Sequence, residues 1–366
     1  AVDWYIDLLR RKQNDSPALK LTIPSEAYRG NKRNQVLYNP YAQSANVNKS
    51  VSLDQFLKMI AQPREVPLQG GRTLEGYYET KNVFIPVDRQ AALRSGAATV
   101  ADSNRIVSRI PLNLANRDQM LKDEIAILDV IGSNLWDRPI YFSVTCRREK
   151  LMGLDNYMQL EGLGLRIVPV RSDGESIYGM IGLGRVNKDA YYENIMNKFK
   201  WGNFDKEDLF VDNSYMPSIQ SMQLGMRRVS FELLRDGQKD KAMALVDKYF
   251  ESFPHKNFPY DYRTMMMLDV IFQADEYQKA KPHMEILAQE TLEYLEYYTS
   301  LLDNKNFQAS YADQYSLRNR DMERLLEEAQ RQNDTEFLQK WEPLFSPYRV
   351  NNNQNGPLDG MQQLNQ

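Results

Sequence analysis

The sequence predicts an α/β domain with a small, mostly parallel sheet at residues 1–188, followed by an all-helical domain of paired helices at 189–348. Before residue 189, helix and strand patterns alternate along the chain with short links, which favours an α/β layer. Beyond it the strand pattern disappears, and long segments with helical spacing of apolar residues follow one another in pairs. Residues 349–366 are rich in Asn and Gln and contain few apolar side chains, so we expect a disordered tail there.

The composition is that of an ordinary globular protein and argues against several functions. Hydrophobic residues make up 42% of the 366 residues and charged residues 26%, which is enough apolar surface for a core. The formal net charge of −3 argues against nucleic-acid binding, which usually needs a basic excess. The single cysteine, Cys146, has no partner for a disulfide within the chain. The two histidines, His255 and His283, have no partner at ligand spacing, so we expect no metal and no cofactor.

The chain contains no stretch of roughly 18 apolar residues that would span a membrane, and it begins without a signal peptide. Residues 1–9 already have the pattern of an amphipathic helix, with no lead-in before them. We therefore expect this sequence to be the excised soluble part of a longer protein.

The N-terminal elements are a helix at 1–12, a long irregular stretch and a second helix that begins near Ser52. Long loops inside a compact domain are uncommon and are usually functional or mobile. Ser52 and Gln55 have the spacing of a capping box, in which each side chain bonds the backbone N–H of the other residue. Pro86, in the apolar run 83–87, indicates an edge strand because proline cannot donate to a sheet ladder.

The most regular helical pattern of the first half lies at 118–131, and we expect Gly132 to end this helix. Its apolar residues cover a broad face, which predicts a well-buried helix. β-Branched and aromatic residues then predict strands, with one further helix between them. The strands are expected at 138–144, 165–170 and 177–181, and the helix at 155–162.

Three helical hairpins are expected in the second half. They join 219–235 to 240–253, 260–273 to 278–302, and 312–332 to 335–344. The first resembles the tetratricopeptide consensus, with Gly237 closing one helix, Ala242 at the close approach of the two helices and Pro254 ending the second. In the second hairpin Ala280 follows Ala242 by 38 positions, against about 34 in a regular repeat. We expect a tetratricopeptide-like domain, and the alternative is an irregular helical bundle.

Stacked hairpins of this kind form a curved groove that usually binds a peptide or a protein face. Tyr294, Tyr297 and Tyr298 lie late in one long helix and are candidates to line such a surface. The alternative is that they pack against the neighbouring hairpin. The sequence thus predicts a protein or peptide partner for the helical half.

Candidate catalytic or ligand-binding residues are few. Glycines at 162–164 and 179–184 lack the strand, helix and acidic residue of a dinucleotide fingerprint, so we interpret them as turn residues. Asp137 and Arg138 form the best polar cluster, at the start of a strand, although a structural salt bridge or turn is the simpler interpretation. Glu161 is a further candidate ligand-binding residue, near the end of an element of the α/β pattern.

Several separate segments resemble one bacterial family and occur in the same order. They lie at 3–7, 124–129, 134–142 (Asn-Leu-Trp-Asp-Arg-Pro-Ile-Tyr-Phe), 156–163, 166–169 and 196–203. Together they are similar to the soluble C-terminal region of a family of multi-spanning membrane proteins of unknown function in Gram-negative bacteria. That family is itself similar to protein O-mannosyltransferases, which are glycosyltransferases.

This resemblance implies a longer protein whose N-terminal membrane domain uses a lipid-linked sugar and carries the catalytic acids. It also implies that the present chain lies on the periplasmic side of the inner membrane. On that basis we expect a non-catalytic region that binds or positions an acceptor protein and contacts its own membrane domain. Two alternatives stay open: a self-contained enzyme with its site near Asp137 and Arg138, and a structural brace for the membrane domain.

Overall fold

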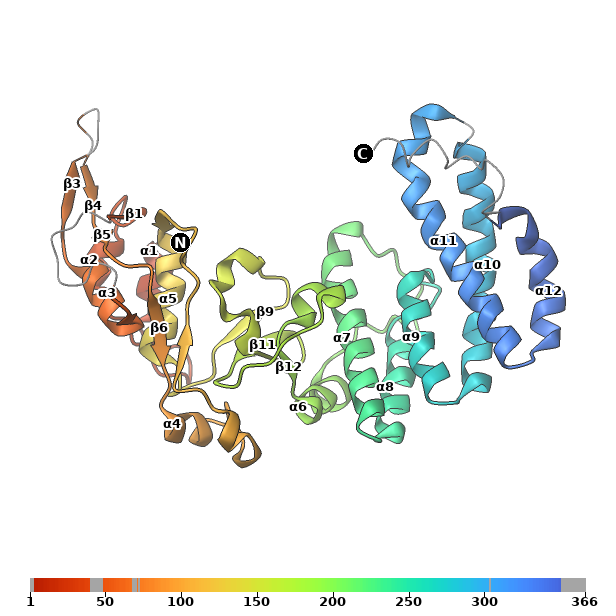
Figure 1. Ribbon diagram of the computed structural model, residues 1–366, viewed down its shortest axis with the longest axis horizontal. Coiled ribbons are helices and arrows are strands. Elements are labelled where there is room, and N and C mark those ends of the chain that lie inside the picture. Colours follow the sequence, from red (N-terminus) through yellow and green to blue (C-terminus); the bar gives the residue numbers. More distant parts are fainter. Residues whose placement is uncertain (1–2, 40–48, 68–70, 72, 303, 350–366) are drawn as a thin grey trace. The chain divides into compact units, whose positions relative to one another are not determined.

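The fold is that of a computed structural model, which describes residues 3–39, 49–67, 71, 73–302 and 304–349 (Figure 1). The chain divides into two compact units, unit 1 at Ala1–Tyr191 and unit 2 at Tyr192–Gln366. The boundary predicted from the sequence follows residue 188. The tail expected at 349–366 lies outside the described residues, except for Arg349. No helix in the described ranges is long and apolar enough to cross a membrane.

Unit 1 combines short helices with small sheets. Its α-helices are α1 (Asp3–Leu9), α2 (Ser25–Tyr28), α3 (Leu53–Ala61), α4 (Arg89–Arg94), α5 (Lys122–Asn134) and, at the boundary, α6 (Lys188–Glu193). Its strands are β1 (Gln35–Tyr38), β2 (Val51–Ser52), β3 (Glu65–Pro67), β4 (Thr73–Glu75), β5 (Tyr77–Tyr78), β6 (Val83–Pro86), β7 (Arg109–Pro111), β8 (Gln119–Leu121), β9 (Tyr141–Ser143), β10 (Met158–Leu160), β11 (Gly164–Ile167) and β12 (Arg185–Val186). These described strands are short, so the sheets supply few ladder hydrogen bonds.

The sheets are mixed, and the prediction of a mostly parallel sheet is wrong. The strand orders are β5-β1-β8, β12-β10-β11-β9, β2-β6-β7 and β3-β4. The pairs β1 with β5, β2 with β6 and β10 with β12 are parallel, whereas the other described pairs are antiparallel. A parallel pair needs a crossover of a dozen or more residues. Between β10 and β11 the chain instead turns over 161–163, where Gly162 has a φ of 105°.

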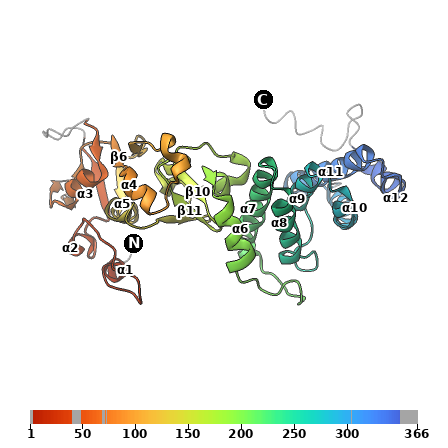
Figure 2. The ribbon, with the colours of Figure 1, turned by 90° about the horizontal axis from the view of Figure 1, so that it is seen from below.

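α5 does not end at Gly132, as predicted, but continues to Asn134. Gly132 faces α3, where a Cβ atom would lie 2.7 Å from Cδ1 of Leu57. This glycine therefore permits the close packing of two helices rather than ending one of them. α3 and α5 lie side by side in Figure 1 and Figure 2. The buried face predicted for α5 is confirmed, since Ile125 and Leu128 are fully buried.

Of two sequence predictions for α3 and β6, one is confirmed and the other is wrong. The capping box is confirmed, because Gln55 N–H donates to Ser52 Oγ over 3.3 Å and Ser52 N–H donates to Gln55 Oε1 over 3.0 Å. The edge position predicted from Pro86 is wrong, because β6 lies between β2 and β7. β2 pairs only with Val83 and Phe84, so the missing N–H of Pro86 falls where β2 has already ended.

Two elements of unit 1 differ in type from the prediction. The helix predicted at 155–162 is a 3₁₀ turn at Leu154–Tyr157 followed by β10, whose side chains are all buried. Burial of both faces removes the alternation that identifies a strand. The strand predicted at 177–181 belongs to an irregular 3₁₀ segment, Ser176–Gly182, which is interrupted at Gly179 with a φ of 56°.

A buried carboxylate ties the irregular N-terminal segment to α5. Asp129 is fully buried and accepts hydrogen bonds from the backbone N–H groups of Thr22 and Ile23 over 2.7 and 3.2 Å. The hydroxyls of Tyr28 and Ser133 lie 3.0 and 3.1 Å from its oxygens. Burial raises the pKa of Asp129, and these donors oppose that rise. The segment is therefore held by side chains of α5, Asp129 among them, rather than by a strand ladder.

Unit 2 is helical over most of its described length. Its long helices are α7 (Met216–Arg235), α8 (Lys239–Ser252), α9 (Tyr262–Gln273), α10 (Tyr277–Leu302), α11 (Lys305–Arg331) and α12 (Thr335–Phe345). Consecutive helices pack against each other, α7 with α8, α9 with α10 and α11 with α12, and lie side by side in Figure 1 and Figure 2. The helix pairs predicted from the sequence match these helices, with ends that differ by several residues.

The turns between the paired helices share one backbone form. Each contains a left-handed residue, at Gly237 (φ 74°), Asp275 (φ 55°) and Asn333 (φ 55°). The following N–H donates to the carbonyl five positions back over 2.9 to 3.2 Å, at Gln238, Glu276 and Asp334. The turns lie 38 residues (237 to 275) and then 58 residues (275 to 333) apart, because α10 and α11 are much longer than α8 and α9. The described hairpins therefore lack the fixed period of a tetratricopeptide array.

Replacing Asp129 by alanine should destabilise unit 1, because the N–H groups of Thr22 and Ile23 would lose their buried acceptor. We expect the free energy of unfolding to fall by about 3 kcal/mol in urea denaturation. Asp137→Ala is the matched control. Its carboxylate is 65% exposed and lies 2.7 Å from Lys20 Nζ, so its removal should cost less than about 1 kcal/mol. Equal losses in the two variants would contradict this role of Asp129.

Candidate functional site

The polar pair predicted as a candidate ligand site lies on the surface of unit 1. Asp137 Oδ2 lies 2.7 Å from Lys20 Nζ, and the two side chains are 65% and 72% exposed. Arg138 Nη2 donates to the carbonyl of Pro17 over 3.2 Å. Both residues follow α5 in the sequence, and their side chains hold the 17–20 segment. Glu161, the third candidate, has its partners elsewhere, on the four-stranded sheet.

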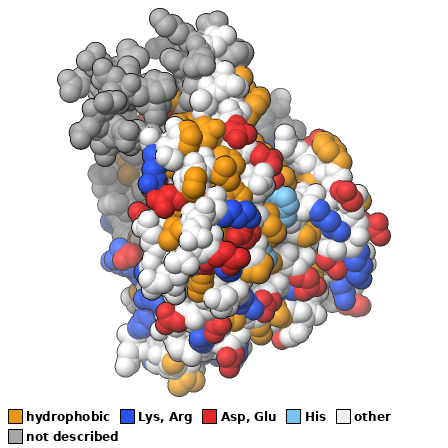
Figure 3. Space-filling model, turned by 90° about the vertical axis from the view of Figure 1, so that its right-hand side faces the viewer, with side chains coloured by type: hydrophobic (Ala, Val, Ile, Leu, Met, Phe, Trp, Pro, Cys, Tyr) orange, Lys and Arg blue, Asp and Glu red, His pale blue; other side chains and the backbone are white. Residues whose placement is uncertain are grey.

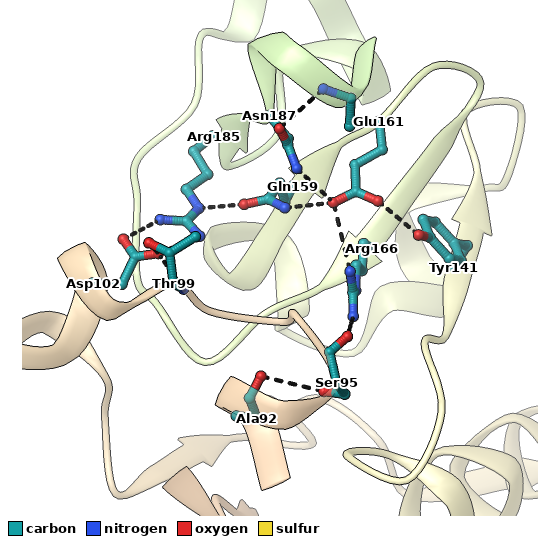
Figure 4. Close-up of polar contacts among 11 residues, drawn as sticks. Ala92, Ser95, Thr99, Asp102, Tyr141, Gln159, Glu161, Arg166, Arg185 and Asn187 are labelled. Carbon is teal, nitrogen blue, oxygen red and sulfur yellow. Dashed lines mark hydrogen bonds and ion pairs between the residues drawn. The ribbon is translucent and has the colours of Figure 1, made fainter. Parts of the chain in front are cut away.

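Glu161 is the centre of a polar network on this sheet (Figure 4). Its side chain is only 8% exposed. Gln159 Nε2 and Asn187 Nδ2 donate to Oε1 over 2.5 and 3.2 Å, and Tyr141 Oη donates to Oε2 over 2.6 Å. The Arg166 guanidinium lies 3.8 Å from Oε1 and supplies a positive charge. Both oxygens of the carboxylate are therefore engaged by side chains from several strands.

The strand register explains why these side chains meet. β12, β10, β11 and β9 lie next to one another in this order. Neighbours in one row across the four strands are Arg185, Gln159, Arg166 and Tyr141. Residues opposite each other on paired strands project from the same face of a sheet. A single row therefore supplies four of the polar side chains, and Glu161 follows β10 to complete the group.

A second carboxylate extends the network beyond the sheet. Arg185 Nε donates to Gln159 Oε1 over 2.6 Å, and the same guanidinium binds Asp102 through bonds of 2.6 and 3.1 Å. Asp102 also accepts from the N–H and the hydroxyl of Thr99, each over 3.0 Å. The hydrogen bonds from Arg185 are the main cause that lowers the pKa of Asp102, to about 2. Asp102 thereby joins the 3₁₀ segment Val100–Arg105 to the sheet.

The hydrogen bonds of the network hold its side chains in position. Tyr141 is its most open member, with 46% of the residue exposed. Burial, followed by the hydrogen bond to Glu161, raises the pKa of Tyr141 to about 12, so the phenol stays protonated at neutral pH and donates. A general base needs a free acceptor, and the Glu161 oxygens are already occupied by donors. Among the described residues, no group of three or more His, Cys, Asp or Glu is placed to hold a metal ion.

The Tyr141 side of the sheet borders an apolar groove of about 470 Å³ in unit 1. α1, α5 and residues of the segment 140–146 line it, and most of these side chains are apolar. Cys146 lies in this lining. Burial raises the pKa of its thiol, which makes Cys146 a poor nucleophile.

The tyrosines predicted to line a partner surface form one aromatic cluster in unit 2. The rings of Tyr294 and Tyr298 stack with centroids 5.7 Å apart, and Tyr298 stacks on Tyr311 of α11 at 5.8 Å. Tyr297 lies 5.6 Å from Tyr298 and is 53% exposed. The cluster thus packs on the neighbouring helix and also leaves one ring largely open to solvent.

Arg318 of α11 fixes the inner side of this cluster. Its guanidinium lies 4.2 Å from the centroid of Tyr294, and its Nη1 donates to the carbonyl of Tyr260 over 3.0 Å. One turn along α11, Asp321 is only 4% exposed, and its Oδ2 has no hydrogen-bond partner among the described residues. Burial raises the pKa of Asp321 to about 7, although Arg318 lowers it. Asp321 is therefore a buried acid one turn from the arginine that contacts Tyr294.

The face of the helical unit in Figure 3 carries acidic and basic side chains in close alternation, with hydrophobic side chains between them. Nucleic acid attracts surfaces on which basic residues gather. The face drawn in Figure 3 shows no such gathering of basic side chains.

Sequence reasoning identified Glu161 but missed its partners. Gln159 fell in a predicted helix, and Arg185 and Asp102 received no role. The signal that would have found them is polar residues inside an apolar run, at Gln159 and Arg166. A buried polar side chain needs a hydrogen-bond partner, so each such residue indicates another nearby. The same signal, an acid within an apolar helical stripe, applies to Asp321.

Glu161→Gln should lower the pKa of Tyr141 from about 12 towards the ordinary tyrosine value, because the phenol would lose its anionic acceptor. The measurement is a ¹³C NMR titration of the tyrosine Cζ signals, with Tyr141→Phe to assign the resonance. Asp173→Asn removes a carboxylate that is 87% exposed and serves as the control. An unchanged Tyr141 titration in Glu161→Gln would contradict the network.

Asp321→Asn should flatten the dependence of the stability of unit 2 on pH. The raised pKa means that the folded state binds this proton more tightly than the unfolded chain, so stability falls as the pH rises from about 4 to about 7. One unit of pKa difference corresponds to about 1.4 kcal/mol. Urea unfolding at either end of this range should differ less for Asp321→Asn than for the native chain. The exposed Asp313→Asn is the control, and identical pH profiles for all three proteins would contradict the prediction.

A known family matches the first half of the chain. The model of the family described as TMEM260-associated domain 2 matches residues 1–190, which is nearly all of unit 1. No curated protein and no solved structure matches the chain significantly. Because the family match covers more than half of the 366 residues, this chain belongs to the TMEM260-associated domain 2 family.

Proposed function

We propose that this chain is a non-catalytic, extracytoplasmic region of a glycosyltransferase-like membrane protein and that it binds or positions an acceptor protein. The observation that carries the proposal is the tyrosine cluster of α10, in which the 53% exposed Tyr297 lies beside Tyr294 and Tyr298. The family of unit 1 supports the membrane context, because its description refers to association with TMEM260.

Tyrosine rings suit a binding surface because they combine a large contact area, few rotatable bonds and a polar hydroxyl. Stacking on Tyr311 and the contact from Arg318 already order the inner rings of the cluster. Less side-chain freedom is then lost on binding, which favours affinity. The helical unit would act as a scaffold of tetratricopeptide type. The turn at Gly237 supports that assignment, and the unequal spacing of the later turns weakens it.

The non-catalytic part of the proposal is supported by the polar groups of unit 1. The carboxylates of Glu161 and Asp102 are engaged by donors, and Asp137 and Arg138 hold the 17–20 segment. These arrangements favour structural roles over the self-contained enzyme with a site at Asp137. The acids that would activate an acceptor belong to the membrane domain implied by the sequence resemblance. The proposed periplasmic location has the same basis.

A structural brace for the membrane domain is the second candidate function, and α1 favours it. Trp4 and Tyr5 of this helix are 67% and 49% exposed, and their rings are 5.8 Å apart. Exposed Trp and Tyr side chains are enriched at membrane–water interfaces and at protein contacts. A brace would use α1 in unit 1, whereas acceptor binding would use α10 in unit 2, so variants of each surface separate the two functions.

Tyr297→Ala should reduce capture of the acceptor protein by at least about tenfold, because truncating an aromatic anchor typically costs about 2 kcal/mol or more. The measurement is a quantitative pull-down from a periplasmic extract with the immobilised chain. Tyr262→Ala, whose ring is 38% exposed on α9, is the matched control and should capture as much as the native chain. Equal capture by all three proteins would contradict the proposed surface. A Trp4→Ala variant that destabilises the membrane domain while capture is unchanged would favour the brace.

A further inference from the structure

β9 is an edge strand, and its outer edge is open in the described part of unit 1. The sheet order leaves β9 with β11 as its neighbour. Val144 N–H donates to the carbonyl of Leu163, and the carbonyl of Ile140 accepts from β11. Because hydrogen bonds of a strand alternate between its two edges, the N–H groups of Tyr141 and Ser143 point away from β11. No described residue accepts a hydrogen bond from either group.

The apolar groove runs along this open edge. The chain leaves α5 at Asn134 and is tied back to the start of the helix by Lys150, whose Nζ lies 2.7 Å from Asp123. The segment that contains β9 therefore runs antiparallel to α5, and the groove lies between them with α1 as a further wall. The helix side chains in its lining are mostly apolar: Tyr5, Ile6, Leu9, Ile127, Val130 and Ile131.

At the end of the groove that contains Cys146, some charged side chains are paired and one is not paired with a described residue. Asp123 is neutralised by Lys150, and Arg148 lies 2.6 Å from Asp155. Arg147, which directly follows the lining residue Cys146, is exposed and forms no ion pair with a described residue. Among the described residues at this end of the groove, Arg147 is therefore a cation without an ion-pair partner, which favours an acidic group on the ligand.

We propose that an extended peptide segment of a partner protein binds in this groove as an additional strand on β9. Its backbone carbonyls would accept from the N–H groups of Tyr141 and Ser143, as in other cases of strand addition. Every second side chain would enter the groove between α1 and α5, so these side chains are apolar. An acidic residue near one end of the segment would pair with Arg147. The Glu161 network holds Tyr141 in position for this contact.

A peptide strand matches the groove better than a compact ligand does. The open N–H groups of Tyr141 and Ser143 are two residues apart along one edge, a separation of about 7 Å that matches the repeat of an extended chain. Most of the described lining side chains are apolar, and Asp123 is paired with Lys150, so few polar groups remain to orient a small molecule. This site lies in unit 1 and is independent of the tyrosine cluster of unit 2, so either can fail without the other.

The test compares two variants at one position that differ in a single backbone donor. Ser143→Pro removes the outward N–H and leaves the ladder to β11 intact, because that ladder uses Phe142 and Val144. Ser143→Ala loses the same hydroxyl, with its contact to Thr145, but keeps the N–H. The probe is a fluorescein-labelled peptide of alternating threonine and valine with an aspartate at each end, and binding is read by fluorescence anisotropy.

We expect Ser143→Pro to weaken binding of this peptide by at least about tenfold and Ser143→Ala by less than about twofold, with equal thermal stability of the two variants. Ala126→Trp, which fills the groove from α5, should abolish binding. Arg147→Glu should weaken binding at low salt and less so at high salt.

Any of three binding results would overturn the proposal, and so would one result on the oligomeric state. The native chain does not bind the peptide, Ser143→Pro binds as well as Ser143→Ala, or Ala126→Trp binds as well as the native chain. A native chain that dimerises in analytical ultracentrifugation, with Ser143→Pro monomeric, would assign the edge to a second copy of this chain and would likewise overturn it.

Discussion

The described strands of unit 1 are two to four residues long and supply few ladder hydrogen bonds, so buried polar side chains add links between segments around its apolar core. Asp102 joins the segment after α4 to the four-stranded sheet through Arg185, and Asp129 joins the N-terminal loop to α5. Removal of either carboxylate would leave donors buried without an acceptor, which costs far more than the loss of an exposed ion pair. Tyr141, which forms part of one wall of the apolar groove, is held by its hydrogen bond to Glu161 in the polar network of the four-stranded sheet.

Features encoded over a few residues could be predicted, whereas features that depend on distant partners could not. The capping box of Ser52 and Gln55 was predicted correctly, because its two hydrogen bonds lie within one turn. The role of Gly132 was not, because it is set by Leu57, which is far away in the sequence. The same distinction applies to the candidate site. Glu161 stood out as a carboxylate, but its partners became apparent only once the strand register placed them in one row.

The two proposed binding surfaces, one in each unit, differ in chemistry. In unit 2, stacked tyrosines on α10 present an open ring on an ordered base, which suits a folded protein face. In unit 1, an open strand edge beside an apolar groove suits an extended segment. Together with the family of unit 1, these surfaces are consistent with a chain that brings a partner to chemistry located elsewhere in a membrane protein.

Hydroxyl-radical footprinting of the chain with and without its captured protein partner tests this role most directly, because oxidation reports the exposure of individual side chains. The proposed role predicts that oxidation of Tyr297 falls on binding, whereas Tyr262 and the surface around Asp137 and Arg138 are unaffected. Protection around Asp137 and Arg138, with Tyr297 still fully oxidised, would contradict it and would support a site at the end of α5 instead.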